Sequence, residues 1–188
     1  MGLLAVATTA GALAVGSYLQ EESPETLHEG GIGPLVVDRD FEKARQAVFR
    51  AAPDTAFSGV GCAGLDEIRY DVELGGHAVG VMAMAENGQI REVEATLYNP
   101  SVTEDREACL ALRNQFAQTF VQRFGPIEQT WQVNKPVSQE LLARTGPVVI
   151  NARWFSMGRS CYVSAHYGVL KGGSVRFGDS LAALADSS

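Results

Sequence analysis

Apolar and polar residues alternate along a stretch of the chain from about residue 66 to about residue 97. The alternation is interrupted at Gly75-Gly76 and again at Asn87-Gly88. A period of two is typical of strands that are buried on one face, and both dipeptides accept the positive φ angles of two-residue hairpin turns. The pattern therefore predicts a three-stranded antiparallel meander.

The two turns also predict which residues face each other across the meander. The expected pairs are Val72 with Val79, Tyr70 with Val81, Val93 with Met82 and Ala95 with Gly80. In this register the middle strand is apolar on both faces, so either a bulge near Gly80 switches its sides or both faces are covered. Glu92 and Glu94 then share a face with the apolar side of the first strand. Paired carboxylates suit acid/base chemistry, but we prefer a bulge that turns both to solvent.

A second hairpin is predicted near the C-terminus, where PVVINARWFSMGRSCYVSAHYGVL turns at Met157-Gly158. One of its faces is apolar throughout, and includes the pairs Trp154 with Cys161, Ala152 with Val163, Ile150 with Ala165 and Val148 with Tyr167. The other face sets Arg153 opposite Tyr162, Asn151 opposite Ser164 and Val149 opposite His166. We interpret Arg153, Tyr162, His166 and Asn151 as a candidate partner-binding surface, with plain solvent exposure as the alternative.

Two other segments show the spacing of helices. Asp40 can cap a helix over residues 41–52, which Pro53 ends. The segment 101–104 has the form of a capping box for a longer helix that ends at Phe124, before Gly125-Pro126. Each helix has an apolar stripe, formed by Phe41, Ala44, Val48 and Ala52 in the first and by Leu112, Phe116, Phe120 and Phe124 in the second. A linker containing Trp131 and a short helical turn near Leu141 are expected to follow.

These elements predict an α+β fold, in which the meander and the C-terminal hairpin form an antiparallel sheet and two main helices pack on one of its faces. The order is compatible with a diverged α-β-β-β repeat, although the two halves show no similarity in sequence. We expect an apolar signal or membrane anchor over residues 1–20, an acidic linker over 21–31, a single α+β domain over 32–170 and a Gly/Ser-rich tail over 171–188.

The N-terminal segment indicates where in the cell the protein is located. Residues 1–20 carry no charged side chain, and the segment EESPETLHE that follows holds four Glu. The small residues around Ala12-Leu13-Ala14 suit a signal cleavage site, but no basic residues precede them. Residues 2–19 would span about 27 Å as a retained anchor, against a bilayer core of about 30 Å. A buried helix is the third interpretation. Because basic residues are expected on the cytoplasmic side, the charge bias favours a cell-envelope location on the periplasmic side, anchored or secreted.

Composition narrows the class of protein further. The chain has 188 residues, of which 46% are hydrophobic and 20% charged, which suits one good-sized core. Its formal net charge is −7, and no cluster of Lys and Arg occurs in it. Proteins that bind nucleic acids usually present such a cluster to the phosphate backbone, so we expect no nucleic-acid partner.

The motif GVGCAG at residues 59–64 fits the spacing G-x-G-x-x-G of dinucleotide-binding loops. Such a loop works when a buried strand precedes it and a helix follows it, so that helix N–H groups meet the pyrophosphate. Here the preceding stretch contains Pro53, and the following stretch has strand periodicity. We therefore interpret the motif as a flexible loop. The spacing of the three His predicts no metal site, and no cofactor motif occurs.

The three cysteines are Cys62, Cys109 and Cys161, and any two of them could form a disulfide. In the alternative, all three are reduced. A thiol enzyme would need a His within hydrogen-bond reach of its nucleophile. Cys161 and His166 lie on opposite faces of one predicted strand, which leaves Cys62 in its glycine loop as the candidate reactive thiol.

Together these features favour a non-catalytic, envelope-located binding or assembly module. It would serve as an accessory or adaptor subunit of a protein complex, and residues 2–19 would contact a membrane if they are retained. One alternative is a periplasmic carrier that holds a small molecule in an apolar pocket beside the Phe-rich helix. The second is a thiol-dependent enzyme that uses Cys62.

Overall fold

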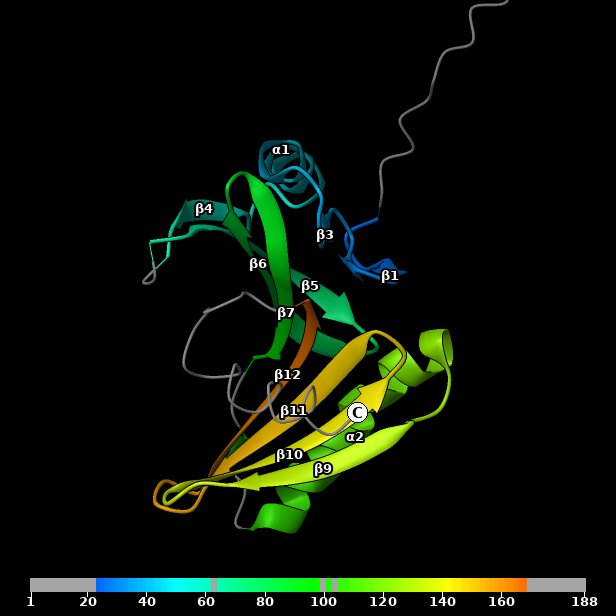
Figure 1. Ribbon diagram of the computed structural model, residues 1–188, viewed down its shortest axis with the longest axis vertical. Helices are drawn as coiled ribbons and strands as arrows, with labels where there is room; N and C mark the ends of the chain where they lie inside the picture. Colours follow the sequence, from blue (N-terminus) through cyan, green and yellow to red (C-terminus); the bar gives the residue numbers. More distant parts are fainter. Residues whose placement is uncertain (1–22, 62–63, 99–100, 103–104, 169–188) are drawn as a thin grey trace, which may run out of the picture.

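The computed structural model describes residues 23–61, 64–98, 101–102 and 105–168. This part of the chain forms a three-stranded sheet, a nine-stranded antiparallel sheet and two helices (Figure 1). The helices are α1 (Phe41–Ala51) and α2 (Arg106–Phe124). The strands are β1 (Leu27–His28), β2 (Gly31–Ile32), β3 (Leu35–Val36), β4 (Phe57–Val60), β5 (Asp66–Leu74), β6 (His77–Glu86), β7 (Gln89–Leu97), β8 (Ser101–Val102), β9 (Gln129–Asn134), β10 (Ser138–Thr145), β11 (Val148–Phe155) and β12 (Ser160–Gly168).

The nine-stranded sheet is assembled from two similar halves. Helix α1 is followed by β4 to β7, and helix α2 is followed by β9 to β12. The strand order is β4-β5-β6-β7-β12-β11-β10-β9, with β8 attached to β12. The last strands of the two halves, β7 and β12, therefore pair at the centre of the sheet, and β4 and β9 form its edges. The repeating unit is one helix with four strands, where the sequence suggested three.

The predicted α+β class is wrong, because the fold is mainly β. Strands account for 51% of the structure and helices for 22%. Two long strands were not expected from the sequence: the linker around Trp131 is β9, and the helical turn expected near Leu141 is β10. The short strands β1 to β4 and β8 were not expected either, and β4 includes Gly59-Val60 of the motif interpreted as a flexible loop. Strand β10 is largely buried on both faces, with Leu141 and Leu142 both inaccessible to solvent or nearly so. A strand buried on both faces does not alternate in polarity, so its period of two is hidden.

The predicted meander is confirmed as β5, β6 and β7. Both turns have positive φ at their two central residues, and the pairs Val72 with Val79 and Tyr70 with Val81 form as expected. The second register differs, because a bulge lies between Met84 and Ala85 and not near Gly80. The extra residue is Arg91, since Ala85 pairs with Ile90 and Met84 pairs with Glu92.

Because of the bulge, the two pairs expected between β6 and β7 are wrong by one residue. Val93 faces Ala83 and Ala95 faces Val81, instead of Met82 and Gly80. All four residues that now face one another are buried. The one-residue shift therefore places the apolar side of β7 against the apolar side of β6, and turns Glu92 and Glu94 to the opposite face.

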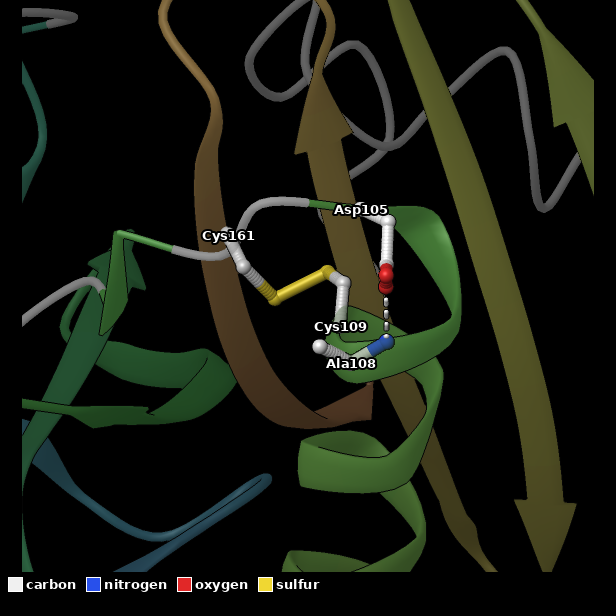
Figure 2. The surroundings of a disulfide bond; sticks show 4 residues. All are labelled: Asp105, Ala108, Cys109 and Cys161. Atoms are coloured by element: carbon white, nitrogen blue, oxygen red, sulfur yellow. Dashed lines mark hydrogen bonds between the residues drawn. A yellow bond between two sulfur atoms is a disulfide. The ribbon is translucent and has the colours of Figure 1, made fainter.

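Helix α1 agrees with the prediction, and helix α2 begins later than predicted. The Asp40 side chain accepts a hydrogen bond from the Lys43 N–H, 2.9 Å away, and so caps α1. The predicted capping box at residues 101–104 is wrong, because Ser101-Val102 forms β8 and pairs with β12. Asp105 caps α2 instead, accepting a hydrogen bond from the Ala108 N–H at 2.8 Å (Figure 2). An acidic cap also suits the partial positive charge at a helix N-terminus.

Helix α2 covers one face of the second half of the sheet, which we call the core face. It packs against β10, β11 and β12, with Phe116 and Phe120 fully buried. The aromatic rings of these two residues meet edge to face, with centroids 5.2 Å apart. Leu112 and Phe124 pack against the same core from its margin. The Phe-rich stripe is therefore part of the hydrophobic core.

The three-stranded sheet packs against the first half of the domain. Ile32 and Leu35 are fully buried, and the Tyr70 hydroxyl lies within hydrogen-bond distance of the Pro24 and Ile32 carbonyl oxygens. Strand β1 and the start of β2 come from the stretch that the sequence analysis assigns to an acidic linker. The proposed signal or anchor at residues 1–20 and the tail at 171–188 lie outside the described residues. Within the described ranges, no helix is long and apolar enough to cross a membrane.

Candidate functional site

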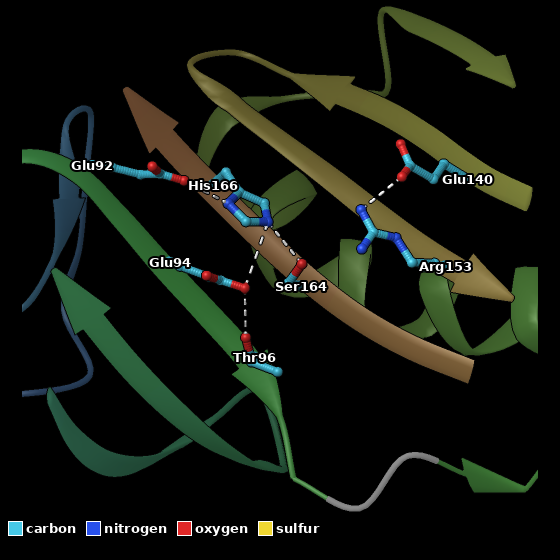
Figure 3. A network of polar contacts seen from close by, with 7 residues as sticks. All are labelled: Glu92, Glu94, Thr96, Glu140, Arg153, Ser164 and His166. Atoms are coloured by element: carbon cyan, nitrogen blue, oxygen red, sulfur yellow. Dashed lines mark hydrogen bonds and ion pairs between the residues drawn. The ribbon is translucent and has the colours of Figure 1, made fainter. Parts of the chain in front are cut away.

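The C-terminal hairpin has the register that the sequence predicts. Arg153 pairs with Tyr162, Asn151 with Ser164 and Val149 with His166. These residues lie on the face of the sheet opposite α2. The neighbouring strands add polar residues to the same face, so that polar side chains from β7, β12, β11 and β10 share it, in two clusters (Figure 3). We call this group the polar face; it comprises Glu92, Glu94, Thr96, Glu140, Asn151, Arg153, Ser164 and His166.

His166 is the centre of one half of the polar face. Its Nε2 atom lies 2.7 Å from the Ser164 hydroxyl, and its Nδ1 atom lies 3.3 Å from a Glu92 carboxylate oxygen. Glu94 approaches Nε2 at 3.8 Å and accepts a hydrogen bond of 2.9 Å from the Thr96 hydroxyl. Figure 3 shows these side chains reaching across the junction of β7 and β12. His166 is 3% exposed, and its imidazole ring is held by polar groups from two strands, β12 and β7.

The expectation that Glu92 and Glu94 turn to solvent is wrong. The bulge does move them off the core face, but they then meet His166 across the central strand pair, where Glu94 is its direct partner. Glu92 is buried, and Glu94 is partly buried. Sequence analysis missed this contact because β7 and β12 are far apart in the chain. The one local signal was that Ser164 and His166, two residues apart, share a face of one strand.

Ser164, His166 and Glu92 are the residue types of a serine-hydrolase triad, in hydrogen-bonding order. A nucleophilic serine must also reach its substrate, and a nearby pair of donors must stabilise the oxyanion. Ser164 is buried, and its hydroxyl lies 2.7 Å from the equally buried His166 ring. We therefore interpret the arrangement as a structural hydrogen-bond network.

A buried ion pair forms the other half of the polar face. Glu140 is fully buried, and its carboxylate accepts a hydrogen bond of 2.6 Å from the Arg153 guanidinium and one of 3.0 Å from the Lys135 ammonium. Both cations are partly buried. Because a carboxylate removed from water is stable only when paired, these contacts fix the positions of three side chains on three adjoining segments. Glu140 was not a candidate in the sequence, where it lies in the misassigned turn.

The four predicted surface residues differ in their exposure. Asn151 and His166 are almost fully buried and Arg153 is partly buried, whereas Tyr162 is 47% exposed. The Asn151 Oδ1 atom is buried and has no hydrogen-bond partner within the described residues. The structure thus places the four residues on one face of the sheet, but only the ring of Tyr162 is broadly accessible.

Tyr162 belongs to an exposed apolar group at the end of the last hairpin. Its ring lies edge to face with that of Phe155, at a centroid distance of 5.7 Å. Met157 at the turn is 85% exposed, and Val137, whose carbonyl oxygen accepts a hydrogen bond from the Ser156 N–H, is also exposed. We call Val137, Phe155, Met157 and Tyr162 the aromatic end; it adjoins the polar face at Arg153.

Of the three cysteine pairings left open by the sequence, the structure forms Cys109–Cys161. This disulfide joins the first turn of α2 to β12 and is buried (Figure 2). Cys62 lies outside the described residues, together with the loop position from which it was proposed to react. Its thiol chemistry therefore remains a prediction.

The structure also bears on ligand sites. The described ranges contain no group of three His, Cys, Asp or Glu residues placed to hold a metal ion. Two open hollows of about 380 and 350 Å³ both include Arg123, at the C-terminal end of α2. Glu29 or Glu25 lies in each, so their walls are partly charged. An enclosed apolar pocket is the usual feature of a lipophilic carrier, and these hollows differ from it.

Tyr98 lies on the first half of the sheet, on the same side as the polar face, where its ring packs over Gly80. A Cβ atom at Gly80 would lie 2.7 Å from the Tyr98 hydroxyl oxygen, so the glycine makes room for the phenol. The hydroxyl donates a hydrogen bond to the Asp71 carboxylate. Partial burial, followed by this hydrogen bond, raises the pKa of Tyr98 to about 12.

This pKa shift predicts how stability depends on pH above neutrality. Between pH 10.0 and about 12, an unfolded chain loses the Tyr98 proton while the folded chain keeps it. The Tyr98 contribution to stability is therefore present below pH 10.0 and falls as the pH rises through this window. The test is an ultraviolet titration of the parent protein, from which the titration of Tyr98→Phe is subtracted. We expect the difference to show a phenol that ionises near pH 12. In Asp71→Asn the pKa of Tyr98 should be lower, because the carboxylate that accepts its hydrogen bond is gone. A difference transition near pH 10.0 would contradict the assignment.

Comparison with known proteins gives little further guidance. No protein-family model and no curated protein matches the chain. A solved structure of a DUF4309-family protein from Bacillus subtilis is 12% identical, with a TM-score of 0.34, over 77% of this chain and 88% of that one. A cysteine-rich secretory protein from Staphylococcus aureus is 10% identical, with a TM-score of 0.29, over 79% of this chain and 49% of that one. Likenesses at this level carry no argument about function.

Proposed function

We propose that this protein is a non-catalytic binding module, exported to the cell envelope, that serves as an accessory or adaptor subunit of a protein complex. The observation that carries the proposal is the aromatic end beside the polar face. Its partner is a protein, and the membrane is contacted through residues 2–19 if that segment is retained. In this role the protein is expected to need no cofactor or metal ion and to bind no nucleic acid.

The aromatic end has the composition of a protein interface. Tyr, Phe, Met and Arg are enriched at the centres of such interfaces, where a few of them supply most of the binding energy. Tyr162 and Met157 are exposed, and Tyr162 is directly opposite Arg153. Arg153 is in turn held by Glu140 at 2.6 Å, so its position is set before a partner arrives. A preorganised surface loses less conformational entropy on binding.

The disulfide supports the export part of the proposal. Buried disulfides form and persist in oxidising compartments, and are rare in the reducing cytosol. Cys109 and Cys161 are both almost fully inaccessible to solvent, which suits a structural role and not a catalytic one. The apolar segment at residues 1–20 is consistent with the same route, as a cleaved signal or as an anchor.

Replacing Tyr162 and Met157 together by Ala tests the binding surface. We expect the double variant to lose at least about tenfold of the partner recovered with the parent, because truncating central aromatic side chains removes much of the binding energy. The measurement is quantitative mass spectrometry of proteins cross-linked to the full-length chain in its native envelope. Arg153 is left unchanged, since its loss would also leave the Glu140 carboxylate short of a partner.

The matched control is Phe49→Ala with Val60→Ala. Both residues are exposed and apolar, but they lie on α1 and β4 in the other half of the domain. Partner recovery should be unchanged in this variant, and the thermal stability of both variants should remain close to that of the parent. Equal recovery with the parent and with the Tyr162 and Met157 variant would contradict the proposal.

A further inference from the structure

Strand β9 forms one edge of the nine-stranded sheet, and within the described chain its outer side pairs with no other strand (Figure 1). Its inner side pairs with β10, and just past the strand the Lys135 N–H donates to the Ser138 carbonyl at 2.8 Å. Backbone groups alternate between the two sides of an antiparallel strand, so Thr130, Gln132 and Asn134 direct theirs outward. Among the described residues, this edge therefore presents a row of backbone donors and acceptors that no neighbouring strand pairs with.

This edge lacks the features by which proteins usually protect an exposed strand. The six residues of β9, QTWQVN, include no charged residue, Pro or Gly, and their pairing with β10 has no register shift. The opposite edge strand, β4, has only four residues, one of which is Gly59. Long, uncharged and regular edges readily pair with another strand, whereas short or interrupted ones do so less.

We propose that β9 pairs antiparallel with β9 of a second copy of this chain, so that the two large sheets become one across a twofold axis. The register is centred on Gln132, which faces the partner's Gln132. Thr130 then faces the partner's Asn134, and Trp131 faces the partner's Val133. This assembly is separate from the aromatic end, so it goes beyond the proposed adaptor role and does not depend on it.

Self-pairing suits both the chemistry and the geometry of this strand. In a sheet that continues across the twofold axis, two residues that face each other must point to the same side of the sheet. The register centred on Gln132 meets this condition, because it pairs even-numbered residues with even-numbered ones and odd with odd. Trp131 and Val133 are only partly buried in one copy, and an aromatic residue opposite a β-branched one is a favourable pair. Each chain has a net charge of −7, yet no like charges meet along the six paired residues.

Charge reversal at the twofold axis tests the register directly. The Gln132 side-chain oxygen accepts a hydrogen bond of 2.5 Å from Arg106 of its own chain, so Gln132→Lys would add two like charges at the axis beside that guanidinium and should raise the dimer Kd by about tenfold. Gln132→Glu keeps an acceptor for Arg106, so its two like charges are partly offset and the increase in Kd should be smaller. An equimolar mixture should recover tight association, because Lys then faces Glu. The measurement is sedimentation equilibrium of the full-length chain over a range of concentrations, with the parent rising from 20.1 kDa toward twice that mass.

The control is Val60→Lys on the opposite edge strand, which should leave the dimer Kd unchanged. The N-terminal apolar segment is present in every variant, so it cannot cause a difference between them, and circular dichroism verifies that each is folded. A parent that stays monomeric, a Gln132→Lys variant that associates like the parent, or a mixture no tighter than its components would each overturn the proposal.

Discussion

Loss of the Cys109–Cys161 disulfide is expected to lower the free energy of unfolding by about 4 kcal/mol. The two cysteines are 52 residues apart, and a cross-link over that distance removes many conformations from the unfolded chain. The change is Cys109→Ala with Cys161→Ala, made in a Cys62→Ser background so that no thiol can form a substitute bond. Guanidinium denaturation, compared with the same background, measures the difference.

Each single Cys→Ala variant should lose nearly as much as the double variant, because either one removes the whole bond. This non-additivity separates the cross-link from the packing of two buried side chains, whose losses would add. A double variant destabilised by less than about 1 kcal/mol would show that the bond contributes little to the fold. Cys62→Ser alone should have no measurable effect on the denaturation midpoint.

Glu140→Gln is expected to destabilise the protein by about 3 kcal/mol or more, because it breaks a buried ion pair and keeps the shape of the side chain. Arg153, which lies 2.6 Å from Glu140, would remain partly buried beside a neutral amide. The denaturation midpoint at neutral pH gives the size of the effect. The matched comparison is Glu42→Gln on α1, where the same 2.6 Å contact is made to Arg45 at the surface.

The surface substitution should leave the denaturation midpoint unchanged, since exposed pairs contribute little. Replacing Glu140 and Arg153 together by Met should recover much of the stability lost by Glu140→Gln, because the more buried of the two cations is removed with its partner. The remaining cation, Lys135, is 32% exposed, so its ammonium can be solvated by water. Equal effects of Glu140→Gln and Glu42→Gln would contradict the assignment of Glu140 as a buried, paired carboxylate.

The sequence predicts well those parts of the fold that depend on neighbours in the chain. The turns at Gly75-Gly76 and Asn87-Gly88 and the register of the last hairpin follow from local turn chemistry and alternation. The Asp40 cap of α1 is equally local. The class of fold was wrong because strands such as β9 and β10 were not recognised. Strand β10 is buried on both faces, so its sequence lacks the alternation of polarity that indicates a strand.

The candidate site could be predicted only in part. The opposed pairs Arg153 with Tyr162 and Asn151 with Ser164 were expected, because they lie within one hairpin. The contacts of His166 with Glu92 and Glu94 depend on the pairing of β12 with β7, which no local pattern indicates. The burial of these residues likewise depends on strand order. Of the four residues expected at a binding surface, three are therefore partly or fully buried in the structure.

The central pairing of β7 with β12 has a consequence for the order of folding. It joins residues 92–96 to residues 164–168, whereas every other long strand pair connects segments that are near each other in the chain. Because closing long loops is slow, we expect the hairpins of each half to form first and the two halves to join last. Both cysteines of the disulfide belong to the second half, from α2 to β12. That half can therefore be oxidised before the halves join, while His166 still lacks its glutamate partners.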